Sequence, residues 1–260
     1  MDKTCLVHRM GVMDYESAWQ LQEKLAAEIA AGERPPTLLL LEHPHTYTFG
    51  RRGHSENLLW DEAELRRRGI QVHWVDRGGD VTYHGPGQLV GYPLIPLAAS
   101  GMILDNASGN PHLPQTDYVG YVRRLEQTLI LALASLNVPA FQADGMTGVW
   151  VKNEKAESDT AGLPAASPAA SPMASPMAKI AAIGVKVDAR GVSRHGFALN
   201  VNPDMSYWKG IIGCGLDGYP VTCLAEILDP VPVMQTVVEA VIRAFAKTYQ
   251  FEIFEEELQT

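Results

Sequence analysis

Residues 77–94 read RGGDVTYHGPGQLVGYPL, a dense combination of glycines, prolines and alternating apolar residues. Strand-forming residues lie on both sides of Pro86-Gly87, a pair that suits the second and third positions of a type II turn. Gly78-Gly79 precedes the first strand and permits positive φ or the close approach of a ligand to the backbone. The pattern predicts a β-hairpin, either as a glycine-rich turn in a sheet or as the floor of a binding site.

Patterns on both sides of this segment predict strands that alternate with helices. Residues 37–53, TLLLLEHPHTYTFGRRG, begin with an apolar run of strand length, which is typical of a strand covered on both faces. Two further strands, joined near residues 189–191, are expected in KIAAIGVKVDARGVSRHGFALNVN. Apolar residues at helical spacing, with Asp14, Asp61 and either Thr116 or Asp117 as caps, predict helices at 14–32, 57–69, 117–138 and 231–249. The expected fold class is therefore α/β or α+β.

Residues 156–178, AESDTAGLPAASPAASPMASPMA, differ in composition from the rest of the chain. Repeated prolines break helix and strand alike, and the segment lacks the large apolar residues of a packed core. We expect a disordered insertion between two strands. The chain is otherwise predicted to form one domain over residues 1–260.

Composition excludes several classes of function. The net charge is −9, with 30 acidic and 21 basic residues, which disfavours a nucleic-acid partner. No apolar run approaches the roughly 20 residues of a membrane span, and the N-terminus lacks a signal pattern, so we expect a cytoplasmic protein without a membrane partner. His43 and His45 have no acidic or thiol partner at ligand spacing, so no metal site is predicted.

Three cysteines, Cys5, Cys214 and Cys223, form neither a disulfide framework nor a zinc motif. Cys214 lies between two glycines, which leaves its sulfur accessible and lets backbone donors face an oxyanion. Cys5 and Cys223 have the settings of small buried hydrophobes. From the residues alone, a structural cysteine in a glycine turn remains the safer interpretation of Cys214.

Four segments in order, RGGDVTYHGPGQLVGYPL, KIAAIGVKV, HGFALNVN and IIGCGLDGYPVTCL, resemble the lipoyl(octanoyl) transferase family, and LEHPHTYTFGRRG matches its early strand. The resemblance covers nearly the whole chain outside the insertion. It implies the fold of biotin and lipoate protein ligases, a mixed sheet flanked by helices. One departure is Gly213, where many relatives have proline.

The resemblance implies an acyltransferase of lipoate biosynthesis and protein lipoylation that needs no cofactor. Octanoyl would move from octanoyl-acyl carrier protein to a lysine of lipoyl domains in 2-oxoacid dehydrogenases or of the glycine cleavage H protein. Cys214 matches the acyl-accepting cysteine and Lys179 its partner lysine. The implied acyl-binding residues are Arg77, Gly78, Gly79, Asp80, Val81, Thr82, Tyr83, His84, Ala182, Ile183, Gly184, Gly196, Phe197 and Ala198.

Physical chemistry is consistent with this route. A thioester is already activated, so a thiolate can exchange onto it without ATP. We expect Lys179 to stabilise the thiolate and to serve in turn as base and acid. Glycines would leave room for an unbranched chain, and Val81, Ile183 and Phe197 are expected to line the slot. His84 either orients the thioester and orders the site or is a hydrogen-bonded turn residue; we favour binding and order over proton transfer.

Two alternatives stay open. An ATP-dependent lipoate or biotin protein ligase would share the fold, but it activates a free acid as an adenylate and needs no acyl-carrying cysteine. A carrier-protein-binding module without turnover would have no need for the Cys214 and Lys179 pair. Octanoylation in the absence of ATP would distinguish a transferase from the ATP-dependent ligase. Loss of transfer in Cys214→Ser would distinguish it from the module without turnover.

Overall fold

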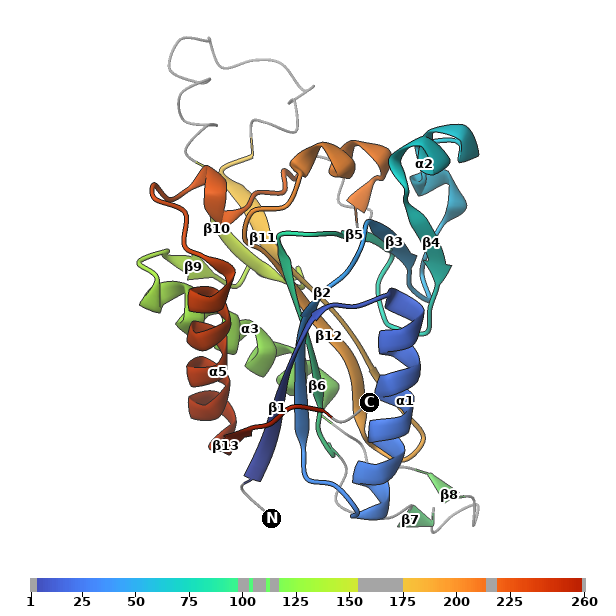
Figure 1. Ribbon diagram of the computed structural model, residues 1–260, viewed down its shortest axis with the longest axis vertical. Coiled ribbons are helices and arrows are strands. Elements are labelled where there is room, and N and C mark those ends of the chain that lie inside the picture. The colour runs from blue at the N-terminus through green and yellow to red at the C-terminus, as the bar shows by residue number, and fades with distance from the viewer. Residues whose placement is uncertain are drawn as a thin grey trace.

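The computed structural model describes residues 4–97, 103–104, 111–112, 117–153, 175–213 and 219–258, which form a large mixed sheet flanked by helices (Figure 1). Its eight strands follow in the order β13 (Glu252–Glu255), β1 (Thr4–Val12), β2 (Thr37–Glu42), β6 (Gln88–Leu94), β12 (Ser193–Asn200), β11 (Met177–Val187), β10 (Val149–Lys152) and β9 (Ala140–Phe141). β1 runs parallel to both of its neighbours, and the other pairs are antiparallel. The predicted fold class is confirmed.

Helices cover both faces of this sheet (Figure 1). Helix α1 (Tyr15–Ala31) packs on one face, while α3 (Tyr118–Ser135) and α5 (Met234–Tyr249) pack on the other. Side chains alternate along β2, so that Leu38 and Leu40 join the core under α3 and α5 while Leu39 and Leu41 join the core under α1. The prediction that this apolar run is covered on both faces is confirmed.

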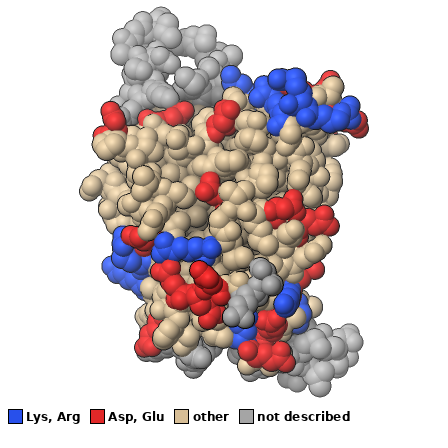
Figure 2. Space-filling model, in the orientation of Figure 1, with Lys and Arg blue, Asp and Glu red and all other residues tan. Residues whose placement is uncertain are grey.

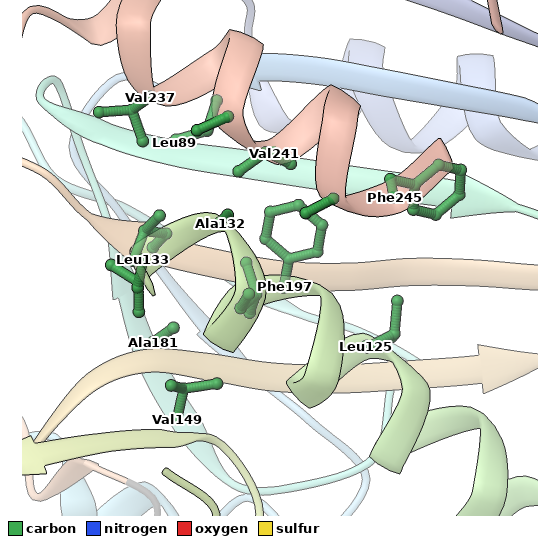
Figure 3. Packing of buried hydrophobic residues seen from close by; sticks show 14 of the residues in the cluster. Leu89, Leu125, Ala132, Leu133, Val149, Ala181, Phe197, Val237, Val241 and Phe245 are labelled. Carbon is green, nitrogen blue, oxygen red and sulfur yellow. The ribbon is translucent and has the colours of Figure 1, made fainter. Parts of the chain in front are cut away.

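Phe197 of β12 belongs to the core on the α3 and α5 side. Figure 3 shows its ring between these two helices, close to Val241. Gly91 on the neighbouring strand β6 makes room for the ring, because a Cβ at residue 91 would overlap it. The ring therefore points away from α1 and from the face on which Ala198 lies.

A second, three-stranded sheet has the order β4 (Gln71–Trp74), β3 (Thr46–Phe49) and β5 (Val81–His84). Its apolar side packs against α2 (Glu62–Arg68) and the 3₁₀ helix η3 (Met205–Gly210). Short elements complete the described chain: η1 (Ser55–Asn57), η5 (Leu224–Glu226), and the strands β7 (Ile103–Leu104) and β8 (Pro111–His112).

The predicted hairpin over residues 77–94 is wrong, although its turn is correct. Gln88 N–H donates to Gly85 O at 3.1 Å and Gly87 has a φ of 85°, as a type II turn requires. β5, however, pairs with β3 in the second sheet, while both edges of β6 are taken by β2 and β12. The turn thus carries the chain from one sheet to the other.

The predicted cap residues agree with the structure, but the helices expected at 57–69 and 231–249 begin later, at Glu62 and Met234. Asp14, Asp61 and Asp117 each accept a hydrogen bond from a backbone N–H in the first turn of α1, α2 and α3. Gly32 and Gly69 end α1 and α2 in the left-handed conformation. Among the described residues, no helix combines the length and apolar character needed to cross a membrane.

The expected insertion joins the adjacent antiparallel strands β10 and β11. Residues 154–174 lie outside the described part of the chain. β11 begins at Met177, and Ala178 is buried in the core, so the last two residues of the segment expected as insertion belong to the sheet. At its base, Asn153 N–H donates to Pro176 O at 3.0 Å and Asn153 Nδ2 donates to Ser175 O at 2.9 Å.

Candidate active site

Three adjoining hollows lie along β11. The inner cavity has a volume of about 50 Å³ and is lined by Tyr15 and by residues from the 77–84 segment, β6, β11 and β12. The outer cleft, of about 500 Å³, extends from Gly79 to Lys179. The Trp150 pocket, of about 20 Å³, lies beside Trp150 and Lys179. Ala182 lines all three, so together they form one slot along β11 with Lys179 at its outer part.

The six residues expected from β11 and β12 are three cross-strand pairs: Ala182 with Ala198, Ile183 with Phe197, and Gly184 with Gly196. All six border the inner cavity. Two segments more than ten residues apart in sequence thus meet through sheet register. Because Phe197 directs its ring into the core on the opposite face, small side chains from Ala182 and Ala198 are left to face the cavity.

Residues on β5 divide between two environments. Thr82 and His84 line the inner cavity, whereas Val81 and Tyr83 pack in the core of the second sheet with Tyr47. This follows from the alternation of side chains along a strand. The expectation that the Val81 side chain lines the acyl slot is therefore wrong.

The turn formed by residues 77–80 closes onto β11. Gly78 N–H donates to Val185 O at 2.9 Å, and Gly79 has a φ of 88°. A Cβ at Gly184 would lie 3.0 Å from Arg77 Cδ, so the glycine allows this close packing. Arg77 Nη2 donates to Thr48 O at 2.6 Å and to Thr48 Oγ1 at 2.9 Å, which ties the turn to β3.

Asp80 holds the neighbouring loop against this turn. Its carboxylate accepts hydrogen bonds from His54 N–H, Asn57 Nδ2 and Val81 N–H. His54 and Arg52 both line the outer cleft. Asp80 was expected along the acyl cleft. It lines the outer cleft, and its hydrogen bonds also position His54 and Asn57 beside it.

Lys179 lies where β11 is irregular. The register of β10 and β11 shifts between Val149 and Trp150, opposite residues 179–181. The Lys179 side chain is 7% exposed, and its Nζ lies 4.7 Å from the centre of the Trp150 ring. A Cβ at Gly148 would lie 3.4 Å from Lys179 Cε, so this glycine leaves space for the amine.

Residues on both sides of the segment 214–218, which contains Cys214, lie beside Lys179. Cys214 itself is within residues 214–218, outside the described part of the chain. Gly213 and Tyr219, the described residues that flank this gap, line the Trp150 pocket together with Lys179. Farther along, Lys179 N–H donates to Pro220 O at 2.9 Å.

The two described cysteines are unsuited to nucleophilic chemistry. Cys5 lies in the core on β1, where burial raises the pKa of its thiol to about 12. Cys223 is 2% exposed at the start of η5. Neither residue lines any of the three hollows, which agrees with the prediction that both are buried hydrophobes.

His84 is fixed on both ring nitrogens. Nδ1–H donates to Gln88 Oε1 at 2.8 Å, and Nε2 lies 3.3 Å from the Thr48 hydroxyl that donates to it. Gln88 in turn donates from Nε2 to Asn200 Oδ1 at 2.9 Å. Burial lowers the pKa of His84 well below its usual value, so the ring is neutral. This geometry favours an ordering role over proton transfer.

Sequence reasoning missed a hydrogen-bonded group formed by the half-buried Asp76 and the buried His195 and Tyr15. His195 has a φ of 55° and is 1% exposed; its Nε2–H donates to Asp76 Oδ1 at 2.8 Å, and the Tyr15 hydroxyl lies 3.5 Å from Nδ1. The hydrogen bond from His195 and the charge of Arg194 lower the pKa of Asp76 to about 2. The sequence does contain His195, the first residue of the segment HGFALNVN, but its partner Asp76 lies 119 residues away, so local spacing could not pair the two.

The arrangement suits chemistry on a narrow, unbranched substrate. Small residues on β11 and β12 face a polar strand across a slot, and a buried amine lies at its outer part. Among the described residues, no group of three or more His, Cys, Asp or Glu side chains is placed to hold a metal ion.

Comparison with known proteins gives consistent similarities. The family described as the lipoyl protein ligase A/B catalytic domain matches residues 14–246. An octanoyltransferase of Chloroflexus aurantiacus is 39% identical over 250 residues, with 96% of each chain covered. An octanoyltransferase of Solibacter usitatus is 40% identical over 251 residues, also with 96% of each chain covered.

Solved structures extend the likeness to the fold. A bi-partite lipoate protein ligase from Thermoplasma acidophilum superposes with a TM-score of 0.64 at 15% identity, covering 100% of this chain and 88% of the other. A lipoate-protein ligase A bound with ATP gives a TM-score of 0.62 at 15% identity, covering 100% and 90%. At 15% identity, this similarity supports a shared fold and nothing more.

Proposed function

The chain belongs to the family of lipoyl protein ligase A/B catalytic domains, and on that premise we propose that it is an octanoyltransferase of protein lipoylation. The observation that carries this proposal is the 36–40% identity, over nearly the full length, to proteins named octanoyltransferase. The donor is octanoyl-acyl carrier protein. The acceptor is a lysine on the lipoyl domains of 2-oxoacid dehydrogenases and on the glycine cleavage H protein, and the exchange takes place in the cytoplasm.

The first half of the proposed reaction moves the acyl group onto Cys214. The thiolate attacks the carbonyl carbon of the donor thioester, a new C–S bond forms, and the bond to the phosphopantetheine sulfur breaks. The leaving thiolate takes a proton from the Lys179 ammonium. Support comes from Gly213, the residue before Cys214, which lines the Trp150 pocket with Lys179.

The second half moves the acyl group onto the acceptor. The neutral Lys179 amine removes a proton from the incoming lysine, whose nitrogen attacks the acyl carbon; the C–N bond forms and the bond to Cys214 breaks. Cys214 leaves as a thiolate beside the restored ammonium of Lys179. The proton balance closes without ATP because the thioester is already activated.

The surroundings of Lys179 support both of its roles. Its Nζ is 4.7 Å from the centre of the Trp150 ring, a distance at which an aromatic face stabilises a cation. The residue is buried, which keeps the amine away from bulk water. The proposed cycle uses the ammonium in its first half and the neutral amine in its second.

The mouth of the outer cleft supports an acidic protein as the donor. Arg52 lines this cleft and has no ion-pair partner among the described residues. Figure 2 shows further basic side chains gathered over α2, in a molecule whose net charge is −9. Arg66, Arg67 and Arg68 of that helix pair with Glu62 and Glu64, which leaves Arg52 as the better candidate contact.

The decisive experiment mixes the purified full-length chain with octanoyl-acyl carrier protein without ATP and follows intact mass and transfer to a lipoyl domain. We expect one octanoyl adduct, mapped to Cys214, and transfer of that group to the acceptor. Cys214→Ser and Lys179→Arg should abolish transfer, while Cys223→Ser and Lys186→Arg serve as matched controls. Transfer only from free octanoate with ATP would contradict the proposal and identify a ligase instead.

A further inference from the structure

Thr82 carries a buried hydroxyl that the protein does not satisfy. The residue is 5% exposed, and Oγ1 finds no hydrogen-bond partner within the described part of the chain. A buried hydroxyl without a partner is unfavourable, so native structures nearly always supply one from the protein or from ordered water.

The neighbours of Thr82 are engaged with one another. Thr48, its cross-strand partner, accepts from Arg77 Nη2 at 2.9 Å and donates to His84 Nε2 at 3.3 Å. The other nitrogen of His84 is bonded to Gln88 at 2.8 Å. Facing threonines on neighbouring strands often bond to each other, but here the Thr48 hydroxyl is turned toward His84. Thr82 lines the inner cavity, so a small molecule in that cavity is the candidate partner for its buried hydroxyl.

The position of Thr82 along the slot places its hydroxyl where the end of an acyl chain would lie. Thr82 lines the inner cavity but not the outer cleft, whereas Lys179 lines the outer cleft but not the inner cavity. An acyl chain whose carbonyl is near Lys179 would reach Thr82 only with its tail. Ala182, Ala198 and Val90 form an apolar wall for that tail. His84 and His195 also line the inner cavity but hydrogen-bond within the protein, whereas the Thr82 hydroxyl does not.

We propose that the Thr82 hydroxyl, through a water that it holds in the inner cavity, sets the length of acyl chain that the slot accepts. The cavity of about 50 Å³ exceeds the volume that a single water requires. A short acyl chain leaves the water in place. A longer one displaces it with methylene groups that cannot replace its hydrogen bond to Thr82, which disfavours that chain. The inference rests on the proposed function, since it concerns the acyl slot of that reaction.

Two variants separate the contribution of the hydroxyl from that of the methyl group. Thr82→Val keeps the shape of the side chain and removes the hydroxyl, whereas Thr82→Ser keeps the hydroxyl and removes the methyl group. The measurement is kcat/KM for octanoyl- and decanoyl-acyl carrier protein with the full-length chain. We expect Thr82→Val to raise the ratio of kcat/KM for decanoyl- over octanoyl-acyl carrier protein roughly tenfold, which is the effect of losing one hydrogen bond. Thr82→Ser should leave this ratio within about twofold of wild type.

Two readouts keep the test independent of turnover. Calorimetric titration with octanoate and decanoate should give the same shift in relative affinity. The melting temperature of Thr82→Val should equal or exceed that of wild type, because no bond within the protein is lost. An unchanged decanoyl-to-octanoyl ratio, an equal change in Thr82→Ser, an unfolded Thr82→Val, or no saturable binding of either acid would each overturn the inference. Failure of the proposed function looks different: the wild-type chain would then take no octanoyl from acyl carrier protein, while the affinity shift would persist.

Discussion

Lys179 and Val221 are joined by an isolated parallel bridge, in which Thr222 N–H donates to Lys179 O at 2.9 Å and Lys179 N–H donates to Pro220 O at 2.9 Å. These bonds fix the main chain of Lys179 against the segment that follows residues 214–218. The Lys179 backbone is held on this side by residues 220–222 and on the other by β10, and its side chain lines the outer cleft and the Trp150 pocket. Four predictions concern the residues that maintain this geometry and its surroundings.

Replacing Gly148 with alanine should destabilise the protein and disturb Lys179. Gly148 has a φ of 119°, and its Cβ would lie 2.7 Å from Ala181 O and 3.4 Å from Lys179 Cε. We expect a loss of about 2–3 kcal/mol in the free energy of unfolding, measured in urea. Gly145→Ala is the matched control, because Gly145 has a φ of 73° but open space around it and should lose only about 1 kcal/mol. Equal losses would show that the crowding near Lys179 is unimportant.

Asp80→Asn should loosen the loop that carries Arg52 and His54. The Asp80 carboxylate accepts three hydrogen bonds, and an amide would turn a donor toward groups that are themselves donors. A loss of about 2 kcal/mol in unfolding free energy is expected. The control is Asp61→Asn at the N-cap of α2, where asparagine serves nearly as well and the change should stay within a few tenths of a kcal/mol. Equal stability of the two variants would contradict this role for Asp80.

Stability should fall as pH decreases from about 6.5 to 4, with His43 contributing strongly. Burial lowers the pKa of His43 to about 4, although the hydrogen bond that Nδ1–H donates to Met13 O acts in the opposite direction. In the neutral ring, Nε2 accepts from the Tyr92 hydroxyl. In this range the unfolded chain binds a proton that the folded chain does not, so protons favour unfolding. The contribution lost on going from pH 7 to pH 4 is up to about 3 kcal/mol.

The check on His43 is a series of urea titrations at several pH values. His43→Gln should show a shallower decline of unfolding free energy than wild type, whereas His54→Gln, at an exposed histidine, should follow wild type. The pKa values of His84 and His195 are also lowered by burial and act with the same sign, so a residual slope is expected in His43→Gln. Parallel curves for wild type and His43→Gln would refute the prediction.

Alkylation should separate the three cysteines. At pH 8 in the native protein, iodoacetamide should modify Cys214, if it is the acyl-accepting thiol, and should spare Cys5 and Cys223. Burial excludes the reagent from both, and a pKa of about 12 leaves almost no thiolate at Cys5. Peptide mass mapping measures the result, with alkylation in urea as the control in which all three react. Native labelling of Cys5 at the rate of Cys214 would count against the assignment.

The sequence predicted local features best, because they depend on neighbouring residues. Asp14 and Gly32 bound α1 as expected, and the turn at Pro86-Gly87 has the expected form. The pairing of strands was less accessible: nothing within residues 81–94 states that β5 and β6 belong to different sheets. That outcome depends on which edges other strands occupy, and β2 and β12 lie far away in sequence.

Within the site, residue identity was easier to predict than side-chain direction. The motif placed Val81 beside Thr82, but only the orientation of β5 determines that Thr82 faces the cavity and Val81 the core. Likewise, the ring of Phe197 could be assigned to the far face only once Gly91 was known to lie opposite it. The pair of Asp76 and His195 depends on two segments meeting in three dimensions, for which local spacing gives no signal.

The hydrogen bonds of Asn153 to Ser175 and Pro176 have a practical consequence for protein engineering. They close the base of the β10–β11 connection, so the two strands stay in register whatever length of chain lies between them. Lengthening a chain segment whose two ends are fixed costs little, about 0.6 kcal/mol for each doubling of its length. The connection is therefore a suitable place to insert an affinity tag or a fluorescent reporter domain. Such a reporter would be attached only a few residues from Lys179.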